Sequence, residues 1–419
     1  MDVNVGLSLC PSGALGGLPP PRNPGLPGFR NIGRKWGKPD LRRGRVGERG
    51  GYRIRSFLAH PSPCPSPGIR AFTPVFDGRR GEGTLRRQSP QHWSCACAAM
   101  LALACYATPA AAQPLTPFKV GVSDAVNTVL PVWMAEAGGF FAANGLKVEV
   151  INMGGGSRGA QDLQAGRIDL MRVGLSSVVQ ANRAGGDLRL IASMSNVIRF
   201  VLVTAPGVKA PADLKGGVIG VSTFGSESDS TITLALERFG LTRADVTVKE
   251  YGGGARRLAA VKSGEIKATA INEPTTSQAR EEGVTVMLDL AAEQIPWLFS
   301  GVVVRRGDLA TPRRDLATRF LKAVIEGNYL ALTDARRAKE VLAKELKLGD
   351  QTIIDISYDD FKAQSPVNME PSMTGADNVI ARSPGAGSRA LADYIDAGVL
   401  DDLKQTTFFT SLRQKYNMR

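Results

Sequence analysis

A long internal repeat constrains this chain more than any other feature of its sequence. The segment INMGGGSRGAQDLQAGRIDLMRVG, at 151–174, recurs without a gap as KEYGGGARRLAAVKSGEIKATAIN, at 249–272, 98 positions later. In each copy a short strand pattern leads into three glycines, and a helical pattern follows before the next strand pattern. Two copies are too few for a solenoid. The repeat therefore predicts two similar α/β lobes.

Strand and helix patterns alternate in both halves, which predicts parallel sheets covered on both faces. The expected strands are at 118–123, 146–153, 168–175 and 188–194 in the first lobe, and at 218–222, 246–251, 266–271 and 285–290 in the second. A helical pattern at 127–143 follows the first strand, and segments 199–205 and 299–304 are expected to lead from one lobe to the other. The expected domains are lobe 1 at 113–206, lobe 2 at 207–298, and a return to lobe 1 with C-terminal helices at 299–419. The predicted hinge segments are 205–208 and 296–300.

The positive charge of the chain is confined to its N-terminal part. The formal net charge is +13, but residues 1–112 hold 16 Lys and Arg against 5 Asp and Glu, and the remainder holds 36 against 34. Residues 1–88 are rich in Gly, Pro and Arg and lack apolar periodicity, which predicts disorder. We interpret them as upstream sequence included by a misplaced start codon; a basic tail that contacts nucleic acid is the alternative. The rest of the chain gives no reason to expect a nucleic-acid partner.

A secretory signal peptide is predicted at 89–112. Two arginines precede an apolar stretch at 93–107, which is too short to span a membrane. Ala110 and Ala112 take the small-residue positions of a cleavage site before Gln113. This pattern predicts a protein that is exported and cleaved.

All cysteines and histidines precede that cleavage site: Cys10, Cys64, Cys95, Cys97, Cys105, His60 and His92. The predicted mature chain therefore has no disulfide, no Cys or His metal site and no histidine base, and the lack of thiols suits an oxidising compartment. Cys105 leaves a lipid anchor open.

The glycine triplets stand where each strand pattern turns into a helix. Consecutive glycines permit unusual backbone conformations, and the N–H groups at a helix start can bind an anion or carboxylate. The triplets match neither a Walker loop nor a dinucleotide fingerprint. Arg158 and Arg256 follow them at equivalent positions. These arginines are either cationic partners of an anionic ligand or surface residues that stabilise the lobes.

Together these features resemble a known family. The secretion signal, the strand–GGG–helix unit, AGRIDLMRVGLSS at 165–177, DLKGGVIGVSTFGS at 213–226 and INEPTT at 271–276 are similar to periplasmic solute-binding proteins of ABC importers. The branch that they resemble is the NMT1/THI5-like one, which includes sulfonate-, taurine-, nitrate- and pyrimidine-precursor-binding proteins. The resemblance covers 117–419. It implies a type II periplasmic-binding-protein fold, with two Rossmann-like lobes, parallel-rich sheets and a two-segment hinge.

The resemblance also implies a ligand held between the lobes, by loops at the carboxyl ends of the strands. Matched position by position, the predicted ligand-binding residues are Ser123, Asp124, Asn127, Gly155, Ser157, Ser176, Ser177, Thr223, Gly225, Ser226, Asn272 and Glu273. Hydroxyl groups and backbone amides suit an oxyanion or a polar head group. Asp124, Glu227 and Glu273 would oppose a plain anion, so a zwitterion or an aromatic compound stays open. Trp297 either stacks on a ligand ring or fills the lobe interface.

The sequence thus predicts the binding component of an ABC importer. It would capture a small organic or oxyanionic solute of the sulfonate, taurine, nitrate or aromatic-acid type and deliver it to the permease subunits, as a monomer without cofactor or metal. The alternatives are a ligand-sensing protein for a membrane receptor and a THI5-like pyrimidine-precursor enzyme. Because the resemblance implies histidine and cysteine for that enzyme chemistry, and the mature chain has neither, we assign no catalytic residue.

Overall fold

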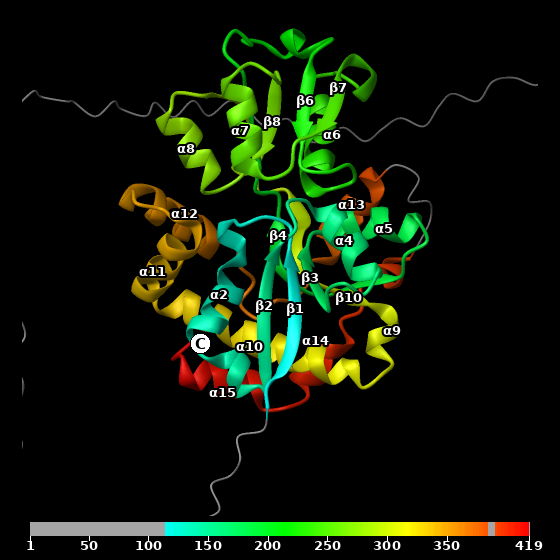
Figure 1. The fold of residues 1–419 in the computed structure, drawn as a ribbon, viewed down its shortest axis with the longest axis vertical. Helices are drawn as coiled ribbons and strands as arrows, with labels where there is room; N and C mark the ends of the chain where they lie inside the picture. Colours follow the sequence, from blue (N-terminus) through cyan, green and yellow to red (C-terminus); the bar gives the residue numbers. More distant parts are fainter. Residues whose placement is uncertain (1–113, 384–389, 419) are drawn as a thin grey trace, which may run out of the picture. The chain divides into compact units, whose positions relative to one another are not determined.

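The structure, a computed structural model, describes residues 114–383 and 390–418. The predicted extension, the signal peptide and Cys105 lie outside the described residues. Two five-stranded sheets are present in the described part of the chain, one in each lobe (Figure 1). This arrangement confirms the predicted mixed α/β class with two parallel-rich sheets.

Lobe 1 contains the sheet with the strand order β2-β1-β3-β10-β4. The strands are β1 (Thr116–Val122), β2 (Leu146–Asn152), β3 (Leu170–Val173), β4 (Leu188–Val197) and β10 (Pro296–Arg305). The helices between them are η1 (Asn127–Val129), α2 (Leu130–Ala137), α3 (Phe140–Ala143), α4 (Gly156–Gln164) and α5 (Leu175–Arg183). β1 pairs in parallel with β2 and β3, whereas β10 runs antiparallel to β3 and β4.

Lobe 2 contains the sheet with the strand order β7-β6-β8-β5-β9. Its strands are β5 (Val201–Thr204), β6 (Val218–Val221), β7 (Thr247–Glu250), β8 (Ala268–Ile271) and β9 (Thr285–Asp289). Its helices are η2 (Pro211–Leu214), α6 (Glu227–Arg238), η3 (Arg243–Asp245), α7 (Gly254–Lys262) and α8 (Thr275–Glu281). β6 pairs in parallel with β7 and β8, and β5 runs antiparallel to β8 and β9. The two sheets thus have the same topology, as the repeat predicts.

The first passage between the lobes lies earlier than the sequence suggested. β5 pairs with β8 and β9, so it belongs to the second sheet although it falls within the expected lobe 1 range. The chain passes between the sheets at 198–200, after β4, and at 290–295, before β10. Pro206, the last residue of the expected lobe 1 range, follows the end of β5 and does not mark the passage. The expected hinge segment 205–208 lies after β5 and the expected segment 296–300 lies at the start of β10, so neither coincides with a crossing segment.

One long predicted helix is interrupted. The helical pattern at 127–143 forms η1, α2 and α3 in succession, and α2 ends at Ala137. Gly139 has a φ of 71°, in the left-handed region, where a regular helix cannot continue. The apolar spacing showed which face is buried but not this break.

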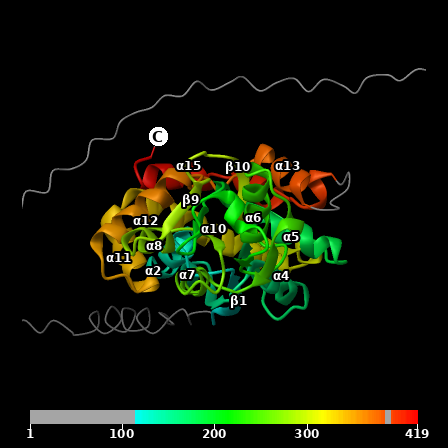
Figure 2. The same ribbon diagram turned by 90° about the horizontal axis from the view of Figure 1, so that it is seen from above.

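After β10, which already belongs to the lobe 1 sheet, the chain is mostly helical. The helices are α9 (Arg306–Leu309), α10 (Arg313–Thr333), α11 (Ala335–Leu346), α12 (Gln351–Gln364), α13 (Met373–Arg382), η4 (Leu391–Asp393), α14 (Gly398–Lys404) and α15 (Phe408–Lys415). α10 packs against α2, and α13 packs against β10 and α5. Figure 2 shows α11 and α12 on one side of the lobe and α13 on the other. α12 also contacts α8 of lobe 2, so the C-terminal helices touch both lobes.

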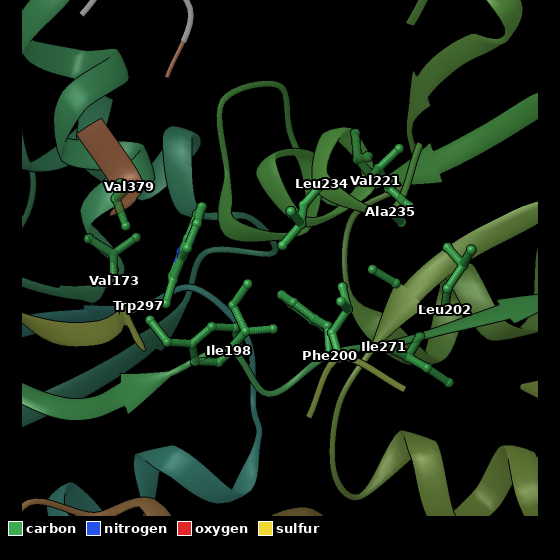
Figure 3. Close-up of a cluster of buried hydrophobic side chains, with 14 of the residues drawn as sticks. Val173, Ile198, Phe200, Leu202, Val221, Leu234, Ala235, Ile271, Trp297 and Val379 are labelled. Atoms are coloured by element: carbon green, nitrogen blue, oxygen red, sulfur yellow. The ribbon is translucent and has the colours of Figure 1, made fainter. Parts of the chain in front are cut away.

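A continuous apolar cluster runs from one lobe to the other through the crossing segments. Val173 and Trp297 belong to it on the lobe 1 side, and Leu202 and Ile271 belong to it on the lobe 2 side (Figure 3). Phe200, in the first crossing, lies between these groups and contacts Phe299 edge-on, with ring centroids 5.0 Å apart. Burial of these side chains stabilises the contact between the lobes.

Candidate ligand-binding site between the two lobes

A small cavity lies between the lobes, where strands of both sheets end. It encloses about 50 Å³. Lobe 1 contributes the loop after β1, the end of β3 and the starts of α4 and α5, and lobe 2 contributes the loop after β6, the start of α6, α7 and the residue after β8. Phe200 and Phe299 add aromatic surface. Both lobes therefore contribute to one site.

Some of the predicted ligand-binding residues line this cavity. They are Ser123, Asp124, Ser177, Ser226 and Asn272. Each follows a strand, lies in a loop or belongs to the first turn of a helix at the carboxyl edge of its sheet. The rule that open α/β sheets bind ligands at this edge selected these positions, which lie next to the cavity, and their role in binding stays a prediction.

Three others form direct contacts between the lobes. The N–H of Ser157, in α4, donates to Oγ1 of Thr223 at 3.2 Å, and its hydroxyl donates to the carbonyl of Phe224 at 2.6 Å. Gly155 lies so close that a Cβ there would be 2.4 Å from Cγ2 of Thr223. The first glycine triplet is thus a place of close approach between the lobes.

Three of the predicted residues lie apart from the cavity. Asn127 donates from Nδ2 to the carbonyl of Ser357 at 3.0 Å and to Asp360 at 2.8 Å, which connects it to α12. Glu273 lies along a separate hollow on the crossing-segment side, and Gly225 lies along a groove on the outside of the lobe interface. Ser176, the remaining predicted residue, bonds to Glu227, as described below.

The serines at the starts of α4 and α5 do not cap these helices. α5 begins at Leu175, so Ser176 and Ser177 lie within its first turn, and α4 has Gly155 in the cap position. Serine is otherwise a frequent capping residue. In this fold glycine takes both cap positions, and the serines are free to point to the lobe interface.

The buried arginines are not the two that follow the glycine triplets. Arg158 and Arg256 are exposed, whereas Arg172 and Arg257 are each only 3% exposed and line the cavity. Sequence analysis missed both. Signals were available: Arg172 interrupts the apolar strand LMRV, and Arg257 lies three residues after Gly254 and four before Val261, on the buried face of α7.

Arg172 has unused hydrogen-bonding capacity in the cavity wall. Nη1 donates to the hydroxyl of Ser123 at 3.2 Å and Nη2 donates to Thr128, both neutral partners. Among the described residues, Nε of Arg172 and the hydroxyl of Ser177 are buried without a partner. Burial lowers the pKa of Arg172 to about 10, and the nearby carboxylates of Asp124 and Glu227 oppose that shift. The arginine is therefore still charged at neutral pH.

Arg257 holds the second glycine turn together. Nη1 donates to the carbonyl of Gly252, Nη2 donates to the carbonyl of Ala270 at 3.0 Å, and Nε donates to Oγ1 of Thr269 at 3.1 Å. Burial lowers its pKa to about 10, and Asp124 opposes that shift. Arg257 thus fixes the loop structure and adds positive charge to the cavity.

Asp124 reaches from lobe 1 to a helix of lobe 2. Its Oδ2 accepts a hydrogen bond of 2.8 Å from the N–H of Gly254, the first residue of α7. The second glycine triplet therefore does offer backbone N–H groups to a carboxylate, as the sequence indicated, and in this structure that carboxylate belongs to the other lobe.

Glu227 makes the corresponding contact in the opposite direction, from lobe 2 to lobe 1. Its carboxylate accepts from the N–H of Ser176 at 2.7 Å, from the Ser176 hydroxyl at 2.9 Å and from Nε1 of Trp297 at 2.7 Å. Burial raises its pKa to about 7, against the effect of these hydrogen bonds and of Arg172. Trp297 is fully buried in the lobe interface. It therefore fills the interface, which was the second of the two roles considered for it.

The described residues contain no group of three or more His, Cys, Asp or Glu side chains placed to hold a metal ion. Within the same residues, no helix combines the length and the apolar character needed to cross a membrane. The polar groups that line the cavity are serine hydroxyls, the Asn272 amide, two arginines and two carboxylates.

Comparison with known proteins defines the class. The family described as NMT1/THI5 like matches residues 127–338, just over half of the chain. The riboflavin-binding protein RibY of Chloroflexus aurantiacus is 26% identical over 239 residues, which cover 53% of this chain and 65% of RibY. The matched region is thus slightly less than two thirds of that relative.

Solved structures share the fold. A protein of Bordetella bronchiseptica RB50 has a TM-score of 0.63 at 20% identity, over 72% of this chain and 98% of that one. The alkanesulfonate-binding protein SsuA of Xanthomonas axonopodis pv. citri, bound to MOPS, has a TM-score of 0.55 at 18% identity, over 64% and 91%. The periplasmic nitrate-binding protein NrtA of Synechocystis PCC 6803 has a TM-score of 0.53 at 15% identity, over 72% and 89%.

The chain has the periplasmic-binding-protein fold, with the two lobes that the repeat predicted. More particularly, it belongs to the NMT1/THI5-like family. Its structural relatives include sulfonate- and nitrate-binding proteins, and the predicted family resemblance is confirmed.

Proposed function

We propose that this protein is the periplasmic solute-binding component of an ABC importer and that it binds a small acidic solute between its lobes. The observation that carries the proposal is the pair of unpartnered buried groups in the cavity wall, Nε of Arg172 and the hydroxyl of Ser177. A buried donor without a partner is costly. An oxyanion in the cavity would accept from both.

The size of the cavity limits the bound group. A cavity needs a volume of about 10–15 Å³ to hold one water molecule. The cavity of about 50 Å³ therefore suits a nitrate, a carboxylate or a sulfonate head group. A solute as large as riboflavin, or one with a large aromatic part, would need the lobes further apart than they are here.

The proposed binding cycle uses the two crossing segments as a hinge. Segments 198–200 and 290–295 connect the sheets, and rotation about them would open the cavity to solvent. A solute that contacts both lobes favours the closed arrangement, because only that arrangement makes all its contacts. The closed monomer would then deliver the solute to the permease subunits, as the family resemblance implies.

The proposed location is the periplasm, after cleavage before Gln113. Support comes from the periplasmic relatives and from the apolar segment and Ala-x-Ala pattern of the sequence. N-terminal sequencing of the protein recovered from the periplasmic fraction tests this: a mature N-terminus at Gln113 is expected, and an intact Met1 would contradict it.

A ligand screen tests the proposed function. The purified protein would be heated with nitrate, methanesulfonate, taurine, benzoate and pyrimidine precursors. A ligand at about 100 times its dissociation constant adds about 2.7 kcal/mol of stability, enough to raise the melting temperature by several degrees. A solute that stabilises the protein would then be titrated by calorimetry.

Matched variants decide whether the cavity is the binding site. R172Q should weaken binding by about tenfold to a hundredfold, because a hydrogen bond to a charged group contributes about 1.5–3 kcal/mol. R158Q removes the same charge from an exposed position and should leave affinity unchanged. Equal losses in the two variants, or no stabilising acid in the panel, would contradict the proposal.

A further inference from the structure

Glu227 is the first residue of α6 in lobe 2, and its carboxylate is held by lobe 1. Ser176, at the start of α5, donates to it from both its N–H and its hydroxyl, and Trp297, in β10, donates from Nε1. The contact is tight: a Cβ on Gly174 would lie 2.2 Å from Oε1 of Glu227. The side chain can be so enclosed only while the lobes are together.

The donors that hold Glu227 are neutral. The charged groups that share the cavity with it are Arg172 from β3, Asp124 from the loop after β1 and Arg257 from α7. On its own helix, Asp229 is paired with Arg243 at 2.5 Å. Two arginines and two carboxylates thus surround the same small volume, and Glu227, at 9% exposure, is one of the buried ones.

The contact can exist in either protonation state of Glu227. A serine hydroxyl both donates and accepts, so the hydroxyl of Ser176 can turn to accept from a protonated carboxyl group. The N–H groups of Ser176 and Trp297 still find acceptor lone pairs on the two oxygens. Protonation therefore removes the charge without breaking the contact.

We propose that Glu227 takes up a proton when the lobes close, so that the protein captures an acidic solute as an anion together with one proton. The nature of the solute in this inference rests on the proposed function. The proton uptake itself depends only on the contact of Glu227 with lobe 1.

The direction of the effect follows from burial. With the lobes apart, Glu227 faces water at the start of a helix. With the lobes together, burial raises its pKa to about 7, more than the hydrogen bonds and Arg172 lower it. The closed arrangement therefore binds more protons than the open one, and closure becomes less favourable as pH rises through this range. An anion bound in the same cavity raises the pKa of Glu227 further, because like charges repel.

The indole of Trp297 provides a direct readout that needs no ligand. Its Nε1–H donates to Glu227 and should shift in a proton–nitrogen NMR spectrum as Glu227 titrates. We would follow this resonance in the full-length protein from pH 5 to pH 9, with its assignment fixed by W297F and Trp133 as reference. E227Q should abolish the transition, and E237Q, which removes a charge from an exposed position of the same helix, should retain it.

A midpoint near 7 that disappears only in E227Q would support the proposal. A midpoint in the ordinary glutamate range, no transition, or the same transition in E227Q would overturn it. Should E227Q fail to fold, the wild-type midpoint and E237Q still decide between these outcomes.

Methanesulfonate then separates this inference from the proposed function. If methanesulfonate binds in the cavity, the pH midpoint of the Trp297 transition should move upward. Calorimetry in buffers of different ionisation heat should then show the uptake of up to one proton. A transition near 7 that methanesulfonate and the other acids of the panel all leave in place supports the lobe contact and contradicts the proposed solute class. Binding of methanesulfonate without proton uptake or pH dependence overturns the inference and retains the proposed function.

Discussion

The two lobes have the same backbone plan but different polar residues at the cavity. α4 and α7 begin at Gly156 and Gly254, and β3 and β8 begin at Leu170 and Ala268, all at the spacing of the repeat. The strand orders also correspond. The repeat therefore determines the fold of each lobe, and the departures from it determine the site.

The buried arginines show this most clearly. At the repeat spacing, the position of Arg172 is taken in lobe 2 by Ala270, whose carbonyl accepts from Arg257. The position of Arg257 is taken in lobe 1 by Gly159, where a Cβ would lie 2.2 Å from Cε of Met171. Each lobe supplies one arginine to the same cavity, but from a different element, so the site has no internal symmetry.

The largest expected effect comes from Glu227, the more buried of the two interlobe carboxylates. Burial raises the pKa of Glu227 from 4.5 to about 7, so between these values the folded protein binds more protons than the unfolded chain. Its contribution to the free energy of unfolding should therefore fall as pH rises, by about 3 kcal/mol in all. Urea unfolding at pH 5, 6, 7 and 8 measures this. In the E227Q variant, the free energy of unfolding should no longer show the fall with pH that Glu227 causes.

D124N is the matched control, because Asp124 makes the reciprocal contact with Gly254 but is less buried. It should retain the pH dependence. Parallel stability profiles for wild type and E227Q would contradict the assignment to Glu227.

Adjacent arginines in α7 should differ in their effect on stability. R257Q removes donors to the carbonyls of Gly252 and Ala270 and leaves those groups without this partner, so a loss of about 2 kcal/mol is expected. R256Q changes an exposed side chain and should stay within about 0.5 kcal/mol of wild type. Denaturant unfolding of both variants tests this, and equal losses would mean that the charge rather than the loop contacts stabilises lobe 2.

The other lobe lies closer to the second glycine of the first triplet, Gly155, than to that of the second triplet, Gly253. An added Cβ at Gly155 would be 2.4 Å from Cγ2 of Thr223, whereas at Gly253 it would be 3.1 Å from Oδ1 of Asp124. G155A should therefore hold the lobes apart and weaken solute binding by about tenfold, and G253A should have a smaller effect. Calorimetry with a solute from the screen measures both.

A second substitution tests whether the clash with Thr223 causes the loss of affinity in G155A. T223S removes the methyl group that meets the new Cβ and keeps the hydroxyl that accepts from Ser157. The double variant G155A/T223S should regain most of the lost affinity. If it does not, the loss comes from the turn itself and not from the lobe contact.

Much of the fold could be predicted from the sequence because the repeat and the strand–helix alternation are local patterns. The passage between the lobes could not, because β5 reads as an apolar strand whichever sheet it joins, and its pairing with β8 is a long-range contact. Pro206 was misleading for the same reason: it shows where a strand ends, not which sheet contains it.

The candidate site was predictable only in outline. The carboxyl-edge rule selected Ser123, Asp124 and Asn272, which line the cavity. Arg172 was passed over because an arginine within a strand pattern looks like an interruption, and its burial depends on Ser123 and on the second lobe. Contacts between lobes, such as that of Glu227 with Trp297, join residues far apart in the sequence and leave no local signal.

The first glycines of the triplets should behave alike, which makes them the most sensitive test of the correspondence between the lobes. Gly154 and Gly252 have φ values of 64° and 77°, in the left-handed region that favours glycine. An added Cβ meets nothing within 4 Å at Gly154 and only an ordinary contact of 3.6 Å at Gly252. G154A and G252A should therefore each cost about 1 kcal/mol, from backbone strain alone. Unfolding by urea would show this, and a difference between them of more than about 0.5 kcal/mol would mean that one turn is also held by the opposite lobe.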